Sequence, residues 1–168
     1  MNHHYLLHHW EVHAFRDGSK TLMIRPADRR RPEVGDVILG LEVWQCSIGD
    51  RFQMRYLLDP DEPQPVSPEQ KRTVVRAMFD SDRYLGEALP AVLLPDPFVR
   101  IRRTIVSIST HEASYIDDKW LDADGYRQVG DFPPRMTRYR QMWNDRFASA
   151  GFKMPSKAPV FVMFLKPA

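Results

Sequence analysis

The chain has a single cysteine, Cys46, among its 168 residues. One cysteine cannot form an internal disulfide or build a thiolate metal site, so both are excluded. The chain also lacks an apolar run near the roughly 20 residues that a membrane-spanning helix needs. Its first residues lack the charged and apolar zones of a secretory signal. We therefore expect a protein without membrane contact, in a reducing, cytoplasmic setting.

A strong excess of one charge is also missing, because the formal net charge is only +2. This value is too small to indicate a nucleic-acid partner by itself. The cations are unevenly placed, however: residues 16–31 contain six Lys or Arg and two Asp. A local basic patch on a nearly neutral protein is typical of selective phosphate contact, with a solvated charged surface as the alternative.

The chain has no internal repeat and no low-complexity tract, and its length and 43% hydrophobic content fit one ordinary domain. Several segments are rich in β-branched and aromatic residues or alternate with period 2, which predicts strands. The alternation slips near Arg103-Thr104, which indicates a bulge there. The predicted strands are residues 21–25, 36–44, 51–57, 99–109 and 159–165, and the last is apolar enough to be buried on both faces.

Residues 59–97 interrupt this strand pattern and are expected to be an insertion. Four of the fourteen prolines lie within residues 59–68. Ser67-Pro68-Glu69-Gln70 is typical of a helix start, with Ser67 as the N-cap and Gln70 three residues later. Further helices are predicted at residues 10–16, 116–121 and 134–147. Several antiparallel strands with peripheral helices predict an α+β fold with a small, curled or closed sheet.

The run Gly18-Ser19-Lys20-Thr21-Leu22-Met23-Ile24-Arg25 is the most informative stretch for function. A turn delivers Lys20 and Thr21 to the start of a strand that carries Arg25, and Arg29 follows closely. Lys20 could clamp a phosphate or activate a nucleophile, and Arg25 could grip a phosphate or the edge of a base. The alternatives are a solvated lysine in a turn and an arginine paired with a nearby acid.

The order of these features resembles ASCH domains, which belong to the PUA-like superfamily. The resemblance covers about residues 4–56 and 98–166 and leaves 59–97 as an insert. It implies a single domain, residues 1–168, built as a small β-barrel with helices around it and a cleft between them. It also implies a link to RNA and modified nucleotides. The resemblance rests on Gly18-x-Lys20-Thr21-x-x-x-Arg25, Val34-Gly35-Asp36-Val37-Ile38, the segment 121–126, Trp143 and the closing strand.

One branch of these domains removes the acetyl group from N4-acetylcytidine with a Lys, a Thr and a Glu, and another is associated with RNA cleavage. The lysine of the first branch corresponds to Lys20 and its neighbouring arginine to Arg25. The Thr position carries Met23 here, and the Glu position carries Asp124. Two of three catalytic positions therefore differ, and Thr21 would have to supply the hydroxyl.

Aromatic residues complete the set of candidate ligand contacts, because nucleobases stack on aromatic rings. Trp120 and Tyr126 lie near Asp124 among polar residues, and core packing is the alternative for both. Five of the six histidines fall within the first 13 residues. They are not expected to hold a metal, because neighbouring positions on a strand point to opposite faces. We expect no metal and no cofactor.

The leading hypothesis is a domain that binds a nucleotide or nucleic acid, either RNA or a modified base, in a basic cleft. Lys20 and Arg25 would hold anionic or carbonyl oxygens, with Arg29 as a further ligand contact. Thr21 and Asp124 would read polar edges of the ligand, and Trp120 or Tyr126 would stack on the base. A hydrolase of an acylated nucleoside would use Lys20, Thr21 and Asp124 as catalytic groups, and a ribonuclease is the second alternative. The fourth possibility is an accessory protein that works through protein contacts of residues 59–97.

Overall fold

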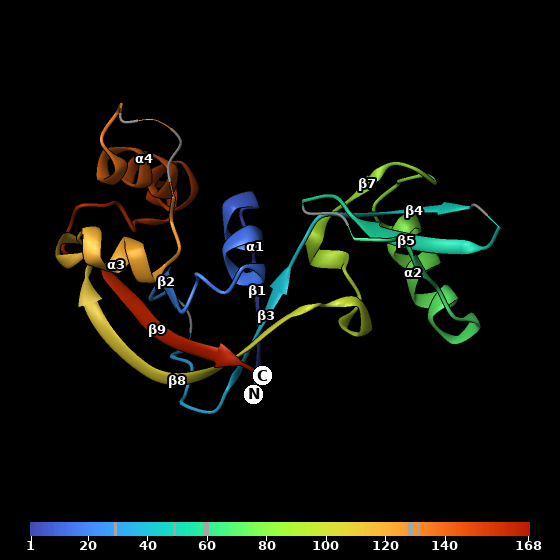
Figure 1. Ribbon diagram of the computed structural model, residues 1–168, viewed down its shortest axis with the longest axis horizontal. Helices are drawn as coiled ribbons and strands as arrows, with labels where there is room; N and C mark the ends of the chain where they lie inside the picture. The colour runs from blue at the N-terminus through green and yellow to red at the C-terminus, as the bar shows by residue number, and fades with distance from the viewer. Residues whose placement is uncertain (29, 49, 59–60, 128–129, 131) are drawn as a thin grey trace.

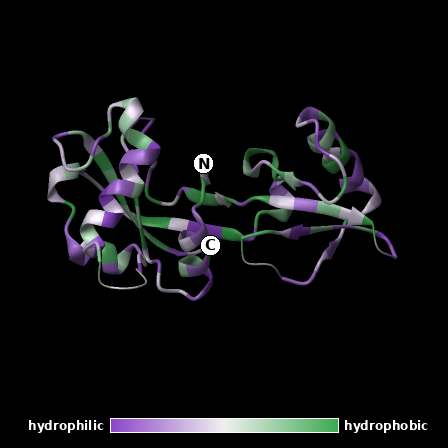
Figure 2. Ribbon diagram, turned by 90° about the horizontal axis from the view of Figure 1, so that it is seen from above, coloured by the Kyte–Doolittle hydropathy of each residue, from purple (hydrophilic) through white to green (hydrophobic). Residues whose placement is uncertain are grey.

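The computed structural model describes residues 1–28, 30–48, 50–58, 61–127, 130 and 132–168. These residues form two lobes that lie side by side, with both chain termini near the middle of the long axis (Figures 1 and 2). The strands are β1 (Asn2–Leu6), β2 (Leu22–Pro26), β3 (Val37–Leu41), β4 (Trp44–Ile48), β5 (Phe52–Tyr56), β6 (Gln64–Pro65), β7 (Ala88–Leu89), β8 (Ile101–Glu112) and β9 (Pro159–Pro167). The α-helices are α1 (His9–Arg16), α2 (Pro68–Asp80), α3 (Asp118–Ala123) and α4 (Arg135–Phe147), and four short 3₁₀ turns are η1 (Ala91–Leu93), η2 (Asp96–Phe98), η3 (Ala113–Tyr115) and η4 (Ala148–Ala150).

The first lobe is built on a five-stranded sheet of order β1-β3-β8-β9-β2. Only the pair β1–β3 is parallel, and the other neighbours run antiparallel. Long β8 and β9 bend strongly, so the sheet curls (Figure 1). The register shift in β8 lies between Ile105 and Ser107, slightly beyond the slip seen in the sequence. The α+β fold with a strongly curled sheet and peripheral helices is thereby confirmed.

Residues 160–163 of strand β9 are buried on both faces, as the apolar sequence predicts, whereas Phe164 is 39% exposed. Phe161 and Met163 pack with Val12 and Phe15 of α1. Val160 and Val162 pack into a second cluster with residues of α3 and α4. Helix α1 and the pair α3–α4 are therefore both held to β9.

The second lobe has its own sheet, of order β6-β5-β4-β7, and its own core. The described residues of the segment 59–97 supply β6, α2, β7, η1 and most of η2, and β4 and β5 complete the lobe. Helix α2 begins as the sequence predicts: Ser67 Oγ accepts a hydrogen bond from Gln70 N at 3.2 Å, and Gln70 Oε1 accepts one from Ser67 N at 3.1 Å.

The strand predicted over residues 36–44 is wrong in one respect, because the chain divides it between the two sheets. Strand β3 ends at Leu41 in the first sheet, and β4 begins at Trp44 in the second. Between them, buried Glu42 accepts hydrogen bonds from the Arg100 guanidinium at 2.6 and 2.9 Å. This ion pair joins the two chain segments that cross from one lobe to the other.

Cys46 reports on the integrity of the second lobe. Its thiol lies in the core of this lobe, and burial raises its pKa to about 12. Because the reactive form is the exposed thiolate, we expect native Cys46 to resist a thiol reagent such as dithionitrobenzoate. Concentrated guanidinium chloride should make it react completely. Rapid labelling of the folded protein would contradict the packing of this core.

Candidate functional site

The structure brings Lys20 and Asp124 into direct contact. Lys20 precedes β2 and Asp124 follows α3, and the Lys20 ammonium donates to the Asp124 carboxylate and, at 3.1 Å, to its backbone oxygen. Gly125 permits this approach: its φ is +74°, and a Cβ there would lie 2.8 Å from Ala14 Cβ and 3.2 Å from Lys20 Cα. The Lys20 and Asp124 side chains are only 0% and 1% exposed.

Glu11 of α1 is the central acid of this buried cluster. Its Oε1 and Oε2 accept hydrogen bonds from Arg25 Nη2 at 2.8 and 3.0 Å. The Lys20 ammonium lies 3.4 Å from Oε1, and Arg146 Nη1 of α4 lies 3.7 Å from Oε2. One carboxylate therefore faces three cations from three parts of the chain. We call Glu11, Lys20, Arg25, Asp124 and Arg146 the ionic cluster.

The pKa values of the two acids of the ionic cluster are shifted in opposite directions. Burial would raise the pKa of Glu11, but the charges of Arg25 and Lys20 outweigh burial and lower this pKa to about 2. Burial raises the pKa of Asp124 to about 6, although Lys20 opposes the change. The hydroxyl of buried Tyr139 donates to Asp124 Oδ2 at 3.2 Å. Protonation of Asp124 in mildly acidic solution therefore removes one negative charge and makes the net charge of the cluster more positive by one.

A cleft of about 650 Å³ lies beside the ionic cluster. Arg25 and Arg146 line it, whereas Glu11, Lys20 and Asp124 do not. The Arg25 guanidinium lies 5.6 Å from the centre of the Tyr5 ring, and that of Arg146 lies 4.9 Å from the Phe147 ring. Leu41 and two apolar residues of the segment 91–94, Val92 and Leu94, also line the cleft, with His4, Leu6, Pro26, Asp28 and Asp96.

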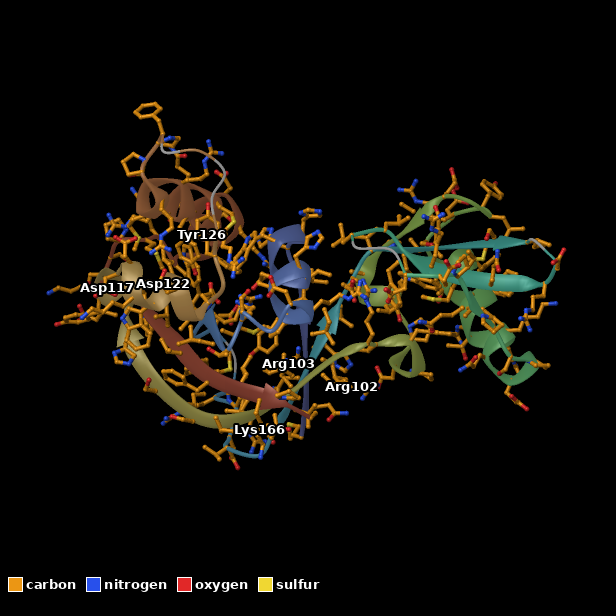
Figure 3. The ribbon with its side chains drawn as sticks, in the orientation of Figure 1. Arg102, Arg103, Asp117, Asp122, Tyr126 and Lys166 are labelled. Carbon is orange, nitrogen blue, oxygen red and sulfur yellow. The ribbon has the colours of Figure 1, made fainter. Side chains whose placement is uncertain are left out.

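The remaining residues singled out from the sequence lie apart from this cleft. Thr21 is exposed, and its Oγ1 lies 3.4 Å from the Ala123 carbonyl oxygen, to which it donates. Tyr126 is buried between α3 and α4 (Figure 3), and its ring lies edge-on to Trp10 at 5.1 Å. Trp120 is half-buried beside His111, at 5.2 Å between ring centres. Arg29 falls outside the described residues.

Several arginines outside the cleft are held by backbone or acidic partners. Arg102 and Arg103 lie near Lys166 where β8 passes the end of β9 (Figure 3). Arg102 Nη2 donates to the Asp96 carbonyl and Arg103 Nη2 to the Phe15 carbonyl, each at 2.6 Å. Arg135, at the start of α4, forms ion pairs with Asp118 and Asp122 of α3. These contacts join elements to one another.

Metal sites and membrane-spanning helices are both missing from the described residues. These residues contain no group of three or more His, Cys, Asp or Glu side chains placed to hold a metal ion. Within the same part of the chain, no helix is long and apolar enough to cross a membrane.

Comparison with known proteins gives likenesses of fold alone. No family model matches the chain, and no curated protein matches it significantly. A hypothetical protein named PH0355 aligns over 100% of both chains with a TM-score of 0.52 at 9% identity, so the two share a fold. The match to the protein EF3133 from Enterococcus faecalis V583 covers 99% of this chain and 79% of EF3133, with a TM-score of 0.49 and 7% identity. An ASCH domain from Lactobacillus crispatus JV V101 matches with 98% and 77% covered, a TM-score of 0.47 and 8% identity.

Glu11, Arg146 and Phe147 are absent from the residues singled out by the sequence. Glu11 occupies the third position of α1, and its Oε2 accepts from His8 N at 2.9 Å, as a capping residue does. An acid at this capping position is common, so the sequence gives no sign that Glu11 also pairs with buried cations. Arg146 and Phe147 end a helix whose arginines are numerous, and nothing in their spacing distinguishes them.

Proposed function

We propose that the cleft binds a nucleotide or a modified nucleobase, free or as part of RNA. The observation that carries the proposal is the presence of two guanidinium groups, Arg25 and Arg146, and two aromatic rings, Tyr5 and Phe147, on the same cleft. Guanidinium groups bind phosphate and carbonyl oxygens, and aromatic rings accept the flat face of a base for about 1–3 kcal/mol. Small-molecule sites commonly enclose about 300–1,000 Å³, and this cleft falls within that range.

The ionic cluster gives Arg25 the rigidity that a recognition residue needs. Both nitrogens at the end of the guanidinium have protein acceptors: Nη2 donates to Glu11, and Nη1 donates to the Ile24 carbonyl at 2.8 Å. Buried Nε has no hydrogen-bond partner among the described residues. An acceptor from a ligand would satisfy this donor, which favours an anion or a carbonyl at this end of the cleft.

Binding accounts for the burial of Lys20 and Asp124 better than catalysis does. A catalytic group has to reach the reacting atoms, and these two side chains are covered by protein and do not line the cleft. The exposed Thr21 hydroxyl donates to the Ala123 carbonyl oxygen. We therefore assign Lys20 and Asp124 a supporting role, in which they hold Glu11 and Tyr139 in place behind Arg25.

The replacement Arg146→Ala tests the proposal, because Arg146 is the more exposed of the two guanidinium groups that line the cleft, at 22% against 7% for Arg25. Loss of one charge-assisted hydrogen bond costs about 1.5–3 kcal/mol, so we expect affinity for nucleoside monophosphates to fall at least about tenfold. The dissociation constants would be measured by calorimetry across the four common bases and a panel of modified ones. The same solutions, analysed by mass spectrometry, would reveal any turnover.

Arg72→Ala provides a matched control, because Arg72 is exposed on α2 and does not line the cleft. It removes the same charge and should leave every dissociation constant unchanged. Equal loss of affinity in the two variants would show that only net charge matters. Wild-type affinity in Arg146→Ala would rule out this cleft as the binding site.

A further inference from the structure

The turn η1 presents the apolar side chain of Val92 to solvent in a fixed position. It lies between Pro90 and Pro95, the Leu93 N–H donates to the Pro90 carbonyl at 3.0 Å, and the Trp44 indole donates to the same oxygen at 3.2 Å. Leu93 packs against the core of the second lobe and Leu94 is buried within it. Val92 between them is nevertheless 61% exposed. The fixed neighbours keep Val92 from turning inward.

Val92 belongs to the lining of the cleft that Arg25 and Arg146 share. The first lobe supplies the two guanidinium groups of that lining, from β2 and α4. The second lobe supplies an apolar contribution, Val92 and Leu94, next to Leu41 at the end of β3. A ligand that fills this cleft therefore meets guanidinium groups from one lobe and aliphatic carbons from the other.

We propose that η1 is the selectivity wall of the cleft and that the ligand is a nucleotide whose base carries a short aliphatic substituent. This inference rests on the proposed function. The phosphate or a base carbonyl would bind Arg25 and Arg146, and the aliphatic group would cover Val92 and Leu94. An unmodified nucleotide would leave Val92 in water. Burial of two or three methylene groups corresponds to a gain in affinity of about tenfold or more.

The assignment gives the second lobe a role in recognition. Its sheet and α2 form a separate core that anchors η1 through Trp44, Leu93 and Leu94. The ion pair between Glu42 and Arg100 fixes the two crossing segments and hence the distance of η1 from the first lobe. The lobe thereby presents a wall of constant position, as discrimination by size and polarity requires.

The test compares two matched pairs of probes, adenosine and cytidine 5′-monophosphates with and without an isopentyl group on the exocyclic amine. Calorimetry on the whole chain should show that the wild type prefers the alkylated member of at least one pair about tenfold or more. Val92→Asp should reduce that preference to within about twofold, because an ionised group replaces the aliphatic contact. Val92→Thr, which retains the side-chain shape, should lower the preference in the same direction.

Val75→Asp is the control, because Val75 is an exposed valine of α2 in the same lobe and does not line the cleft. It should keep the full preference. Equal binding of both probes by the wild type, or an unchanged preference in Val92→Asp, would overturn the selectivity wall. The proposed function would still stand if Arg146→Ala weakened both probes. Failure of the wild type to bind any of the four probes would overturn both proposals.

Discussion

Replacing Lys20 with Met is expected to lower the free energy of unfolding by about 3–5 kcal/mol in mildly alkaline solution, because it leaves a buried carboxylate without its cation. The Asp124 side chain is 1% exposed and cannot recover the lost interaction from water. Its remaining side-chain partner is the Tyr139 hydroxyl, at 3.2 Å. Urea denaturation followed by tryptophan fluorescence measures the change.

The loss should depend on pH in a specific direction. The pKa of Asp124 is raised to about 6 in the folded wild type, above its value in the unfolded chain. Folding therefore takes up a proton, and the stability contributed by this group falls as pH rises from about 4 to about 6. Without Lys20 the folded pKa rises further, so the variant should keep losing stability above pH 6, at up to about 1.4 kcal/mol per pH unit.

Two variants make this result specific. Adding Asp124→Asn to Lys20→Met removes the titrating group and should abolish the additional pH dependence. Lys119→Met removes an exposed lysine of α3 and should leave the stability curve unchanged. If Lys20→Met ran parallel to the wild type across this pH range, the buried pair would not be the source of the stability.

Local patterns predicted the elements whose causes are local. Ser67 and Gln70 cap α2 because both bonding groups lie within four residues of each other. Residues 160–163 of β9 are buried on both faces because helices cover them while the strand pairs along both of its edges. The spacing of Lys20 and Arg25 places both on the same short segment, and the structure shows them facing one carboxylate.

The rest depended on contacts between distant positions. The strand expected over residues 36–44 divides at Glu42, whose partner Arg100 lies 58 positions away. The apolar side of the cleft, Val92 and Leu94, comes from η1 and the residue after it, inside a segment whose sequence indicates only an insertion. Tyr126 stands among polar neighbours in the sequence yet packs against Trp10 and Tyr139, which come from two other helices. No local pattern encodes these pairings.

Glu11→Gln is expected to have the other large effect, about 3–5 kcal/mol near neutral pH. The replacement keeps the shape of the side chain and removes the charge that Arg25, Lys20 and Arg146 share. The pKa of Glu11 is lowered to about 2 in the folded chain. Its ionised form therefore contributes stability that is complete above about pH 4.5 and is lost as pH falls toward 2.

The stability losses caused by Lys20→Met and by Glu11→Gln therefore change with pH in different ranges. The stability curves of the wild type and Glu11→Gln should run parallel above about pH 7, where Asp124 is ionised in both, and converge below about pH 4, whereas those of the wild type and Lys20→Met diverge above pH 6. Arg25 and Arg146 also lose the negative charge that holds them in Glu11→Gln, so nucleotide affinity should fall with stability. Glu69→Gln, on the first turn of exposed α2, is the matched control. A Glu11→Gln protein that was as stable as the wild type at neutral pH would remove Glu11 from the centre of the ionic cluster.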